Sequence, residues 1–277
     1  MSPRIAKRLR DAFTNVGTWV AALLFFFPLL YMVLTSFKSE EDVIPPSLFI
    51  DNPTVENYRT VLDDRMFAHL GNSVSVTLST VACSLLLGVP AAYAIVFGSM
   101  RRKRADNLFF WFLSTTLLPP VSVVVPVYLI FRTLGILDTI FGLVFIYTGI
   151  HTPIVIWMTR SFLMDVPKQL IESAAIDGAS KVRAFFSIIL PLVRSGVAST
   201  ALLVFVFVWN ESFFALNVAS VNAATLPVYM ASFMTQEGLF WAKLSAIATF
   251  VILPPLILGW LSHKQLVKGL TMGAIKG

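Results

Sequence analysis

The sequence carries little charge for its length. Only 13% of its 277 residues are Asp, Glu, Lys or Arg, whereas 57% are hydrophobic and 24 are Phe. Soluble domains carry about 25% charged residues, so this composition excludes a soluble globular core. Apolar runs of about 20 residues recur instead, which is the length that crosses about 30 Å of hydrocarbon. Long segments of alternating polarity, which a membrane barrel needs, are too few. The sequence therefore predicts an all-α integral membrane protein.

Cysteines, clustered histidines and catalytic motifs are scarce as well. The single cysteine, Cys83, lies in an apolar run, which excludes a disulfide framework and a cysteine metal site. His69, His151 and His263 are isolated from one another, and no HExxH, GxSxG or paired-carboxylate pattern occurs. The phosphate-binding pattern G-x-x-x-x-G-K-[ST] is also missing. We therefore expect no catalytic residue, no metal, no cofactor and no ATP hydrolysis by this chain itself.

Six apolar stretches are long enough to cross a membrane. We expect the spans at about 16–35, 74–97, 108–131, 140–158, 192–214 and 244–261. Prolines inside several of these stretches predict bent helices. The first stretch is long and lacks a small-residue cleavage site, which favours an uncleaved span over a signal peptide. The predicted organisation is a cytoplasmic segment 1–15, a six-helix transmembrane domain 16–262 with a cytoplasmic loop 160–191, and a cytoplasmic tail 263–277.

The positions of the basic residues predict the orientation. Sixteen of the 21 Lys and Arg lie on the side of the N-terminus, and five lie on the other side. Because loops rich in Lys and Arg stay in the cytoplasm, both termini and the 160–191 loop are predicted to be cytoplasmic. The net charge of +6 is then explained by orientation and by contact with anionic lipid. The basic run Arg101–Arg104 is interpreted in the same way, and no nucleic-acid partner is expected.

The longest polar interruption on the predicted cytoplasmic side runs from Asp165 to Pro191. Pro167 suits the first turn of a helix, and Gly178 suits a left-handed stop after it. Between them, apolar residues recur at a spacing of four and share one face, with Glu172 beside that face. Ser173 and the two alanines after it are small, so another protein could approach closely. The pattern predicts a short docking helix between two spans.

This stretch resembles the EAA loop of ABC importer permeases. The family pattern is EAA, three residues, Gly, nine residues and I-x-L-P, and here Ser173 replaces the first alanine. The surrounding VPKQLIESAAIDGAS and the ending GLTMGAIKG are similar to carbohydrate importers of the maltose-permease type. The resemblance implies a set of loop residues that couple the permease to the ATPase: Glu172, Ser173, Ala174, Asp177, Gly178, Ile188, Leu190 and Pro191. It also implies a tail that contacts the ATPase: Gly273, Ala274, Ile275, Lys276 and Gly277.

The same resemblance implies a permease subunit of an ATP-driven, binding-protein-dependent importer for a sugar, oligosaccharide or polyol in a bacterial inner membrane. The implied partners are a second permease, two ATP-binding subunits and an extracytoplasmic solute-binding protein. The alternative for the whole chain is a stand-alone ion-coupled carrier, which needs titratable groups at mid-membrane. The alternative for Glu172 is a solvated carboxylate facing Lys168, four residues away.

The triplet Trp209-Asn210-Glu211 carries the most isolated charge within a predicted span. An ionisable residue in a span is a functional hypothesis, so these three residues are candidates for the translocation path or an outer gate. The alternative places Glu211 near the outer end of its span, with Trp209 at head-group depth.

The polar stretch 217–240 resembles the loop that related permeases raise toward the solute-binding protein. Its polar residues suit such a contact: Asn217, Asn222, Thr225 and Gln236. An ordinary connecting loop is the alternative.

Overall fold

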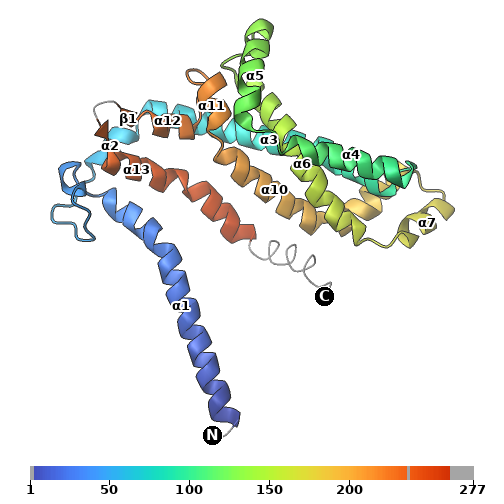
Figure 1. Ribbon diagram of the computed structural model, residues 1–277, viewed down its shortest axis with the longest axis horizontal. Coiled ribbons are helices and arrows are strands. Elements are labelled where there is room, and N and C mark those ends of the chain that lie inside the picture. Colours follow the sequence, from blue (N-terminus) through green and yellow to red (C-terminus); the bar gives the residue numbers. More distant parts are fainter. Residues whose placement is uncertain (1–2, 236–237, 263–277) are drawn as a thin grey trace. The chain divides into compact units, whose positions relative to one another are not determined.

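The computed structural model describes residues 3–235 and 238–262 (Figure 1). In these ranges the strands are limited to β1 (Met234–Thr235) and β2 (Gly238–Leu239), which pair antiparallel with Met234 opposite Leu239. Four helices are long and apolar enough to cross a membrane, or up to six if each of two bent pairs forms one span. The predicted all-α class is confirmed.

The remaining elements are helical. In chain order they are α1 (Pro3–Thr35), η1 (Glu41–Val43), α2 (Glu56–Val61), α3 (Asp64–Phe97), α4 (Arg102–Thr115), α5 (Pro120–Leu134), α6 (Ile140–Met164), α7 (Gln169–Ile176), α8 (Lys181–Ala184), η2 (Phe185–Ile189), α9 (Leu190–Leu192), α10 (Arg194–Trp209), α11 (Phe213–Val218), α12 (Leu226–Ala231) and α13 (Trp241–Val251).

The predicted spans 16–35, 74–97 and 140–158 lie within α1, α3 and α6, and the span 244–261 lies within the helical segment Trp241–Ser262. The predicted boundary between residues 15 and 16 falls inside α1, which is one continuous helix. The point at which α1 enters the membrane therefore remains a prediction. The predicted tail 263–277 lies outside the described residues.

The described residues form two units. The first contains the chain up to Met66 together with Met230–Leu253. In it, α13 packs against α1 and α2. The Glu40 carboxylate accepts the backbone N–H groups of Ala242 and Lys243, both at 3.0 Å. These amides have no partner within their own helix, so Glu40 caps the start of α13 and attaches the segment after α1 to it.

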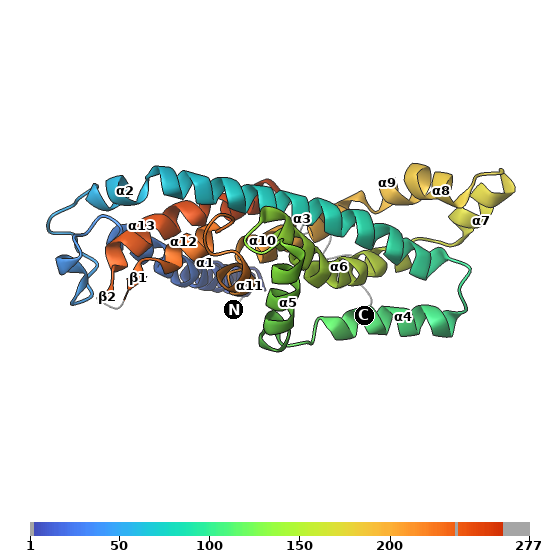
Figure 2. The same cartoon turned by 90° about the horizontal axis from the view of Figure 1, so that it is seen from above.

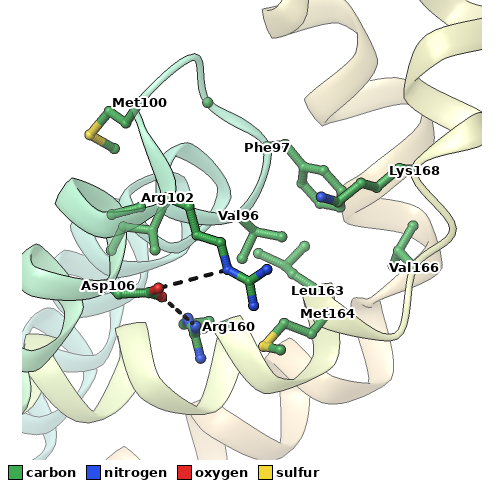
Figure 3. A pocket seen from close by; sticks show the side chains of 13 residues that line it. Val96, Phe97, Met100, Arg102, Asp106, Arg160, Leu163, Met164, Val166 and Lys168 are labelled. Carbon is green, nitrogen blue, oxygen red and sulfur yellow. Dashed lines mark hydrogen bonds and ion pairs between the residues drawn. The ribbon is translucent and has the colours of Figure 1, made fainter.

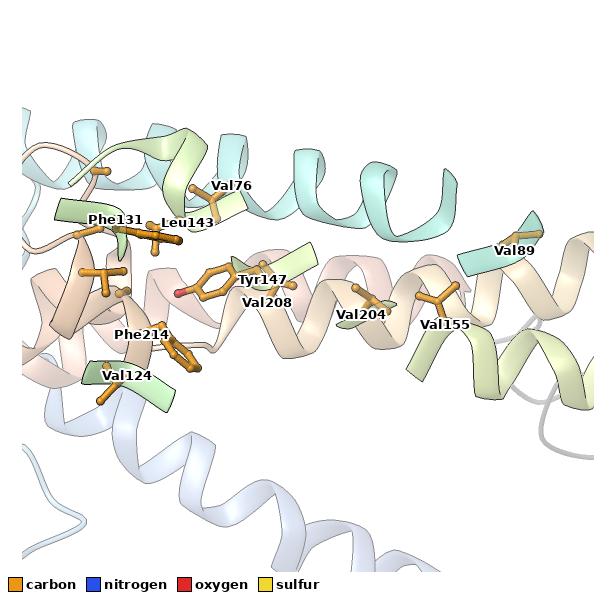
Figure 4. Close-up of a cluster of buried hydrophobic side chains, with 14 of the residues drawn as sticks. Val76, Val89, Val124, Phe131, Leu143, Tyr147, Val155, Val204, Val208 and Phe214 are labelled. Atoms are coloured by element: carbon orange, nitrogen blue, oxygen red, sulfur yellow. The ribbon is translucent and has the colours of Figure 1, made fainter. Parts of the chain in front are cut away.

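The second unit contains Phe67–Tyr229 and the described residues from Pro254 onward. Here α3 runs beside α6 and α10, and α4 packs along α6 (Figure 2). Its main core joins side chains from α3, α5, α6, α10 and α11, as Figure 4 shows. The largest fully buried member is Tyr147, which is 0% exposed. This core fixes the helices whose ends carry the candidate sites.

Glycine allows α3 to approach α6 closely. A Cβ atom added at Gly88 would lie 2.6 Å from Cγ1 of Val155, and Val155 is 0% exposed. Small residues permit such approaches between helices in membranes. Gly71 lies on the same helix with no atom within 4 Å of an added Cβ.

Gly88→Ala should therefore destabilise the protein by about 1–3 kcal/mol, the usual cost of overpacking a core. Gly71→Ala is the matched control and should be neutral or slightly stabilising, because alanine favours helix. Thermal unfolding of the two purified variants in one detergent is the measurement. Equal unfolding temperatures would contradict the close packing of α3 on α6.

The third predicted span, 108–131, is not one straight helix. α4 and α5 are bent by 87° where they meet. Pro119 and Pro120 occupy the break, and Pro120 begins α5. A proline restricts the residue before it to extended conformations, so two in succession end α4. Pro126 and Pro153, by contrast, lie inside the continuous helices α5 and α6.

Candidate functional site

The predicted docking helix forms and ends as expected. α7 lies at one end of the second unit, beyond the end of α6 (Figure 1). Gly178 has φ of +78°, the left-handed conformation that glycine adopts without strain. The Ala179 N–H donates to the Ala174 carbonyl at 2.8 Å, and the Gly178 N–H donates to the Ala175 carbonyl at 3.1 Å. This pair of bonds is the Schellman motif, and the predicted left-handed stop at Gly178 is confirmed.

One side of α7 is held by the rest of the unit. Ala174 is only 6% exposed, and Ile171 packs against a buried cluster of α3, α4 and α6. Glu172, Ser173, Ala175 and Ile176 are exposed, Ile176 by 86%. The exposed surface of α7 is thus formed by Glu172, Ser173, Ala175 and Ile176, while Ala174 is buried against the rest of the unit.

Lys168 lines a cavity beside Arg160, and within the described part of the chain no ion pair joins it to Glu172. Glu172 is exposed, as the alternative of a solvated carboxylate expects, so its docking role stays a prediction. Asp177 is exposed at the end of α7.

The chain returns from α7 to the core through a distorted helix. Ser180 caps α8 by accepting the Arg183 N–H at 3.2 Å. Residues Phe185–Ile189 form a π-helical turn directly before Leu190 and Pro191. Proline has no N–H and its ring meets the carbonyl four residues earlier, and a π turn relieves that clash by widening the helix. Such turns often mark functional sites.

The fifth predicted span, 192–214, is also interrupted. The segment Lys181–Leu192 and the helix α10 are bent by 77°, and α10 ends at Trp209. Pro191, predicted to set the start of this span, lies just before the bend and is exposed. Ile188 and Leu190 are half-buried, so they connect the loop to the core.

An ion-pair cluster fixes the other side of the same loop. Figure 3 shows Asp106 of α4 between two arginines. Its carboxylate lies 3.3 Å from the Arg160 guanidinium and 4.0 Å from Nε of Arg102. The Arg160 guanidinium also lies 4.3 Å from the ring centroid of Phe109. The cavity beside this cluster holds about 370 Å³. Through Arg160, the start of α4 is tied to the last turns of α6, close to where α7 begins.

Glu211 lies in the break between α10 and α11 rather than inside a helix. Its carboxylate accepts a hydrogen bond from the Tyr147 hydroxyl of α6 and the Phe214 N–H at 3.1 Å. Glu211 thus caps α11 and ties it to α6. Asn210 is exposed, and its side chain bonds the Val206 carbonyl of its own helix at 2.8 Å.

Trp209 is 2% exposed and stacks on Phe205, with the ring centroids 5.5 Å apart. Its side chain therefore packs inside the unit, and its placement at head-group depth stays a prediction. The assignment of Trp209, Asn210 and Glu211 to a translocation path or outer gate remains a prediction.

The four polar residues predicted to contact a partner from 217–240 differ in exposure. Thr225 is 4% exposed, whereas Asn222 is exposed, with its side chain donating to Asp138 and its carbonyl accepting from Asn72. Asn217 is exposed and bonds the Phe213 carbonyl. Gln236 lies outside the described residues. The most exposed large apolar side chain between α11 and α12 is Val221, 73% exposed, which polarity alone does not indicate.

The predicted ATPase-contacting tail, Gly273, Ala274, Ile275, Lys276 and Gly277, lies outside the described residues as well. Among residues 3–235 and 238–262, no group of three or more His, Cys, Asp or Glu side chains is placed to hold a metal ion. His151 is buried in α6 and stacks on Phe207.

Comparison with protein families decides the identity. Residues 84–267 match the family described as the binding-protein-dependent transport system inner membrane component. The chain belongs to this family. The match covers the loop 160–191 and both interrupted spans.

Relatives extend the match to the full length of the permease. It is 36% identical over 278 residues to a probable ABC transporter permease of Sinorhizobium fredii, covering 100% of this chain and 99% of that one. It is 34% identical to a trehalose/maltose transport permease, MalG, of Thermococcus litoralis, covering 95% of each chain. It is 32% identical to the diacetylchitobiose uptake permease DasC of Streptomyces coelicolor, covering 97% and 99%.

Solved structures share the fold. One chain of a bacterial ABC transporter that imports the acidic polysaccharide alginate superposes with a TM-score of 0.73 at 21% identity, covering 95% of the permease and 98% of that chain. A chain of the inward-facing MetNI methionine ABC transporter superposes with a TM-score of 0.59 at 13% identity, covering 75% and 99%. The fold of this chain is thus shared with chains of two solved transporters.

Proposed function

We propose that this permease imports a carbohydrate, as one membrane subunit of a complex with a second permease, two ATP-binding subunits and an extracytoplasmic solute-binding protein. Relatives named for trehalose, maltose and diacetylchitobiose uptake, each at least 32% identical, support a saccharide or polyol as the substrate class. The chain has no phosphate-binding loop of its own, so ATP is hydrolysed by partner subunits.

The exposed face of α7 is the observation that carries this proposal. Glu172, Ser173, Ala175 and Ile176 form a small outward surface on a helix whose other side is buried. The ATPase subunit receives this surface, and a basic group on it meets Glu172. α7 is held near both ends, because Ile171 packs against the buried cluster and the Schellman bonds fix the turn after Ile176.

Motion of the ATPase then reaches the spans through two connections. One passes through the α6 end, where Arg160 is bound to Asp106 of α4. The other passes through α8 and the π turn into α10. Closure of the ATPases on ATP shifts α7, and the spans turn from inward-facing to outward-facing. The binding protein then delivers sugar, and hydrolysis resets the complex.

The proposed orientation follows from the excess of basic residues on one side. The side that bears α7, Arg102 and Arg160 faces the cytoplasm, and the segment between α11 and α12 faces outward. Both termini are cytoplasmic in this arrangement.

Transport by the assembled complex in proteoliposomes tests the function. Uptake of a saccharide should require ATP inside the vesicles and the binding protein outside, and it should survive an uncoupler that collapses ion gradients. Vesicles lacking the ATP-binding subunits are the matched control and should take up none. Uptake without ATP that an uncoupler abolishes would identify an ion-coupled carrier instead.

A further inference from the structure

The segment from the last residue of α11 to the first residue of α12, residues 218–226, is irregular between these two ends but is held at many points. Ala219, Ala223 and Ala224 are each at most 2% exposed. Val221 and Asn222 lie between them and are exposed. We call residues 218–226 the outer segment. Its buried alanines and exposed apex are typical of a loop with one fixed conformation.

Asp138 holds the outer segment from one side. One carboxylate oxygen accepts the N–H groups of Val221 at 3.1 Å and Ala223 at 3.3 Å. The other accepts both the backbone N–H and the side-chain Nδ2 of Asn222, each at 2.8 Å. The Asp138 N–H donates to the Val218 carbonyl at 2.8 Å. A single residue thus makes five hydrogen bonds across the start of the segment.

The conformation of Asp138 suits this role. Its φ is +55°, which is uncommon for a residue with a Cβ and is tolerated best by Asp and Asn. It follows α5, and α11 packs beside α5, so the turn reaches the outer segment (Figure 1). Burial alone would raise the pKa of the Asp138 carboxyl, but the hydrogen bonds from Asn222, Val221 and Ala223 together lower it. The carboxylate therefore stays ionised and keeps accepting at neutral pH.

The start of α3 holds the segment from the other side. Asn72 Nδ2 donates to the carbonyls of Asn222 and Ala224, both at 3.0 Å. His69 Nδ1 lies 2.9 Å from the Ala224 carbonyl, which only accepts, so Nδ1 carries the proton. The Ser73 hydroxyl accepts the Leu226 N–H at 2.8 Å. With both sides fixed, little conformational freedom is left between Val218 and Leu226.

We propose that Asp138 is a positioning residue that holds Val221 and Asn222 ready for the solute-binding protein. A preorganised loop lowers the conformational entropy lost when a partner binds. The apex then offers one apolar side chain, Val221, next to an amide whose polar groups are already oriented. This inference rests on the proposed function, because it needs a binding protein that docks on the outer face.

The test uses the complete complex in proteoliposomes and measures ATP turnover against the concentration of liganded binding protein. Asp138→Asn keeps the size of the side chain but replaces one accepting oxygen by a donor, so the bonds from Asn222 or those from Val221 and Ala223 are lost. The half-saturating concentration should rise about tenfold, whereas the maximal rate should stay near that of the unchanged complex. Hydrogen exchange at the amides of Val221, Asn222 and Ala223 should become faster.

Two further variants distinguish a failure of the role proposed for Asp138 from a failure of docking on the outer segment. Asp42→Asn is the matched control, because Asp42 is an exposed carboxylate bonded by Ser39 of its own turn, and it should change neither quantity. Val221→Arg alters the exposed apex itself. It should weaken the stimulation of ATP turnover by the binding protein, whether or not Asp138 holds the loop. An effect of Val221→Arg with none of Asp138→Asn, despite faster exchange, would overturn the role of Asp138. No effect of Val221→Arg would overturn the docking of the binding protein on this segment, and with it that part of the proposed function.

Discussion

Glu172→Arg should separate the permease from its ATP-binding subunits. Glu172 is exposed on α7 and has no ion pair with Lys168 in the described part of the chain, so its charge is available to a partner. Charged pairs that become desolvated on docking cost about 2–5 kcal/mol when one member is removed, which is about thirtyfold or more in affinity. A reversed charge adds repulsion to that loss. Pull-down of the ATP-binding subunits in detergent and sugar-stimulated ATP turnover measure the effect.

A charge reversal elsewhere provides the control for this variant. Glu56 lies on the short helix α2, its side chain is 69% exposed, and its one ion pair, to Arg59, spans 3.8 Å at the surface. Surface pairs of this kind contribute about 0–1 kcal/mol, so Glu56→Arg should assemble and turn over ATP normally. If Glu172→Arg assembled and transported as well as Glu56→Arg does, α7 would have no part in coupling.

The docking helix is the part of the site that local sequence signals predict well. Pro167, the apolar spacing and Gly178 act within one or two turns of each other, so spacing alone specifies a helix with a left-handed end. The structure confirms that end at Gly178 with φ of +78°. Spacing could not tell which alanine is buried, because the burial of Ala174 depends on α7 lying against the rest of the unit.

The two interrupted spans are predicted less well because hydropathy measures composition rather than direction. Residues 108–131 are apolar throughout, yet α4 and α5 are bent by 87°. Pro119 and Pro120 predict a bend, but the angle is set by packing, of α4 against α6 and of α5 against α11.

The contacts that hold the functional segments could not be predicted from the sequence. Arg160 and Asp106 are 54 residues apart, and Asp138 and Asn222 are 84 apart. No motif of fixed spacing relates such distant residues, because the packing of α4, α5 and α6 decides whether they come into contact. The sequence contains only two local signals for these contacts. One is the single acidic residue Asp106 after the basic run Arg101–Arg104, and the other is Asp138, three residues after Gly135.

Glu211→Ala should destabilise the permease by about 2–5 kcal/mol. Its carboxylate accepts from the Tyr147 hydroxyl and the Phe214 N–H, and Tyr147 is 0% exposed. Removing it leaves two buried donors without their acceptor, each costing about 1–3 kcal/mol. Tyr147→Phe removes one of these donors and keeps the ring. In the double variant Glu211→Ala/Tyr147→Phe no hydroxyl is left unpaired. The loss in the free energy of unfolding should therefore be smaller than the sum of the two single losses by about 1.5–3 kcal/mol.

The same variants distinguish a structural role of Glu211 from a role in the translocation path. Thermal unfolding gives the coupling between Glu211 and Tyr147, and uptake per assembled complex gives the transport activity. If the carboxylate ties α11 to α6, Glu211→Gln keeps an accepting oxygen and should retain transport in proportion to the folded complex. A Glu211→Gln complex that is as stable as the unchanged one but transports nothing would instead place Glu211 in the path or gate, because only the loss of its charge would then matter.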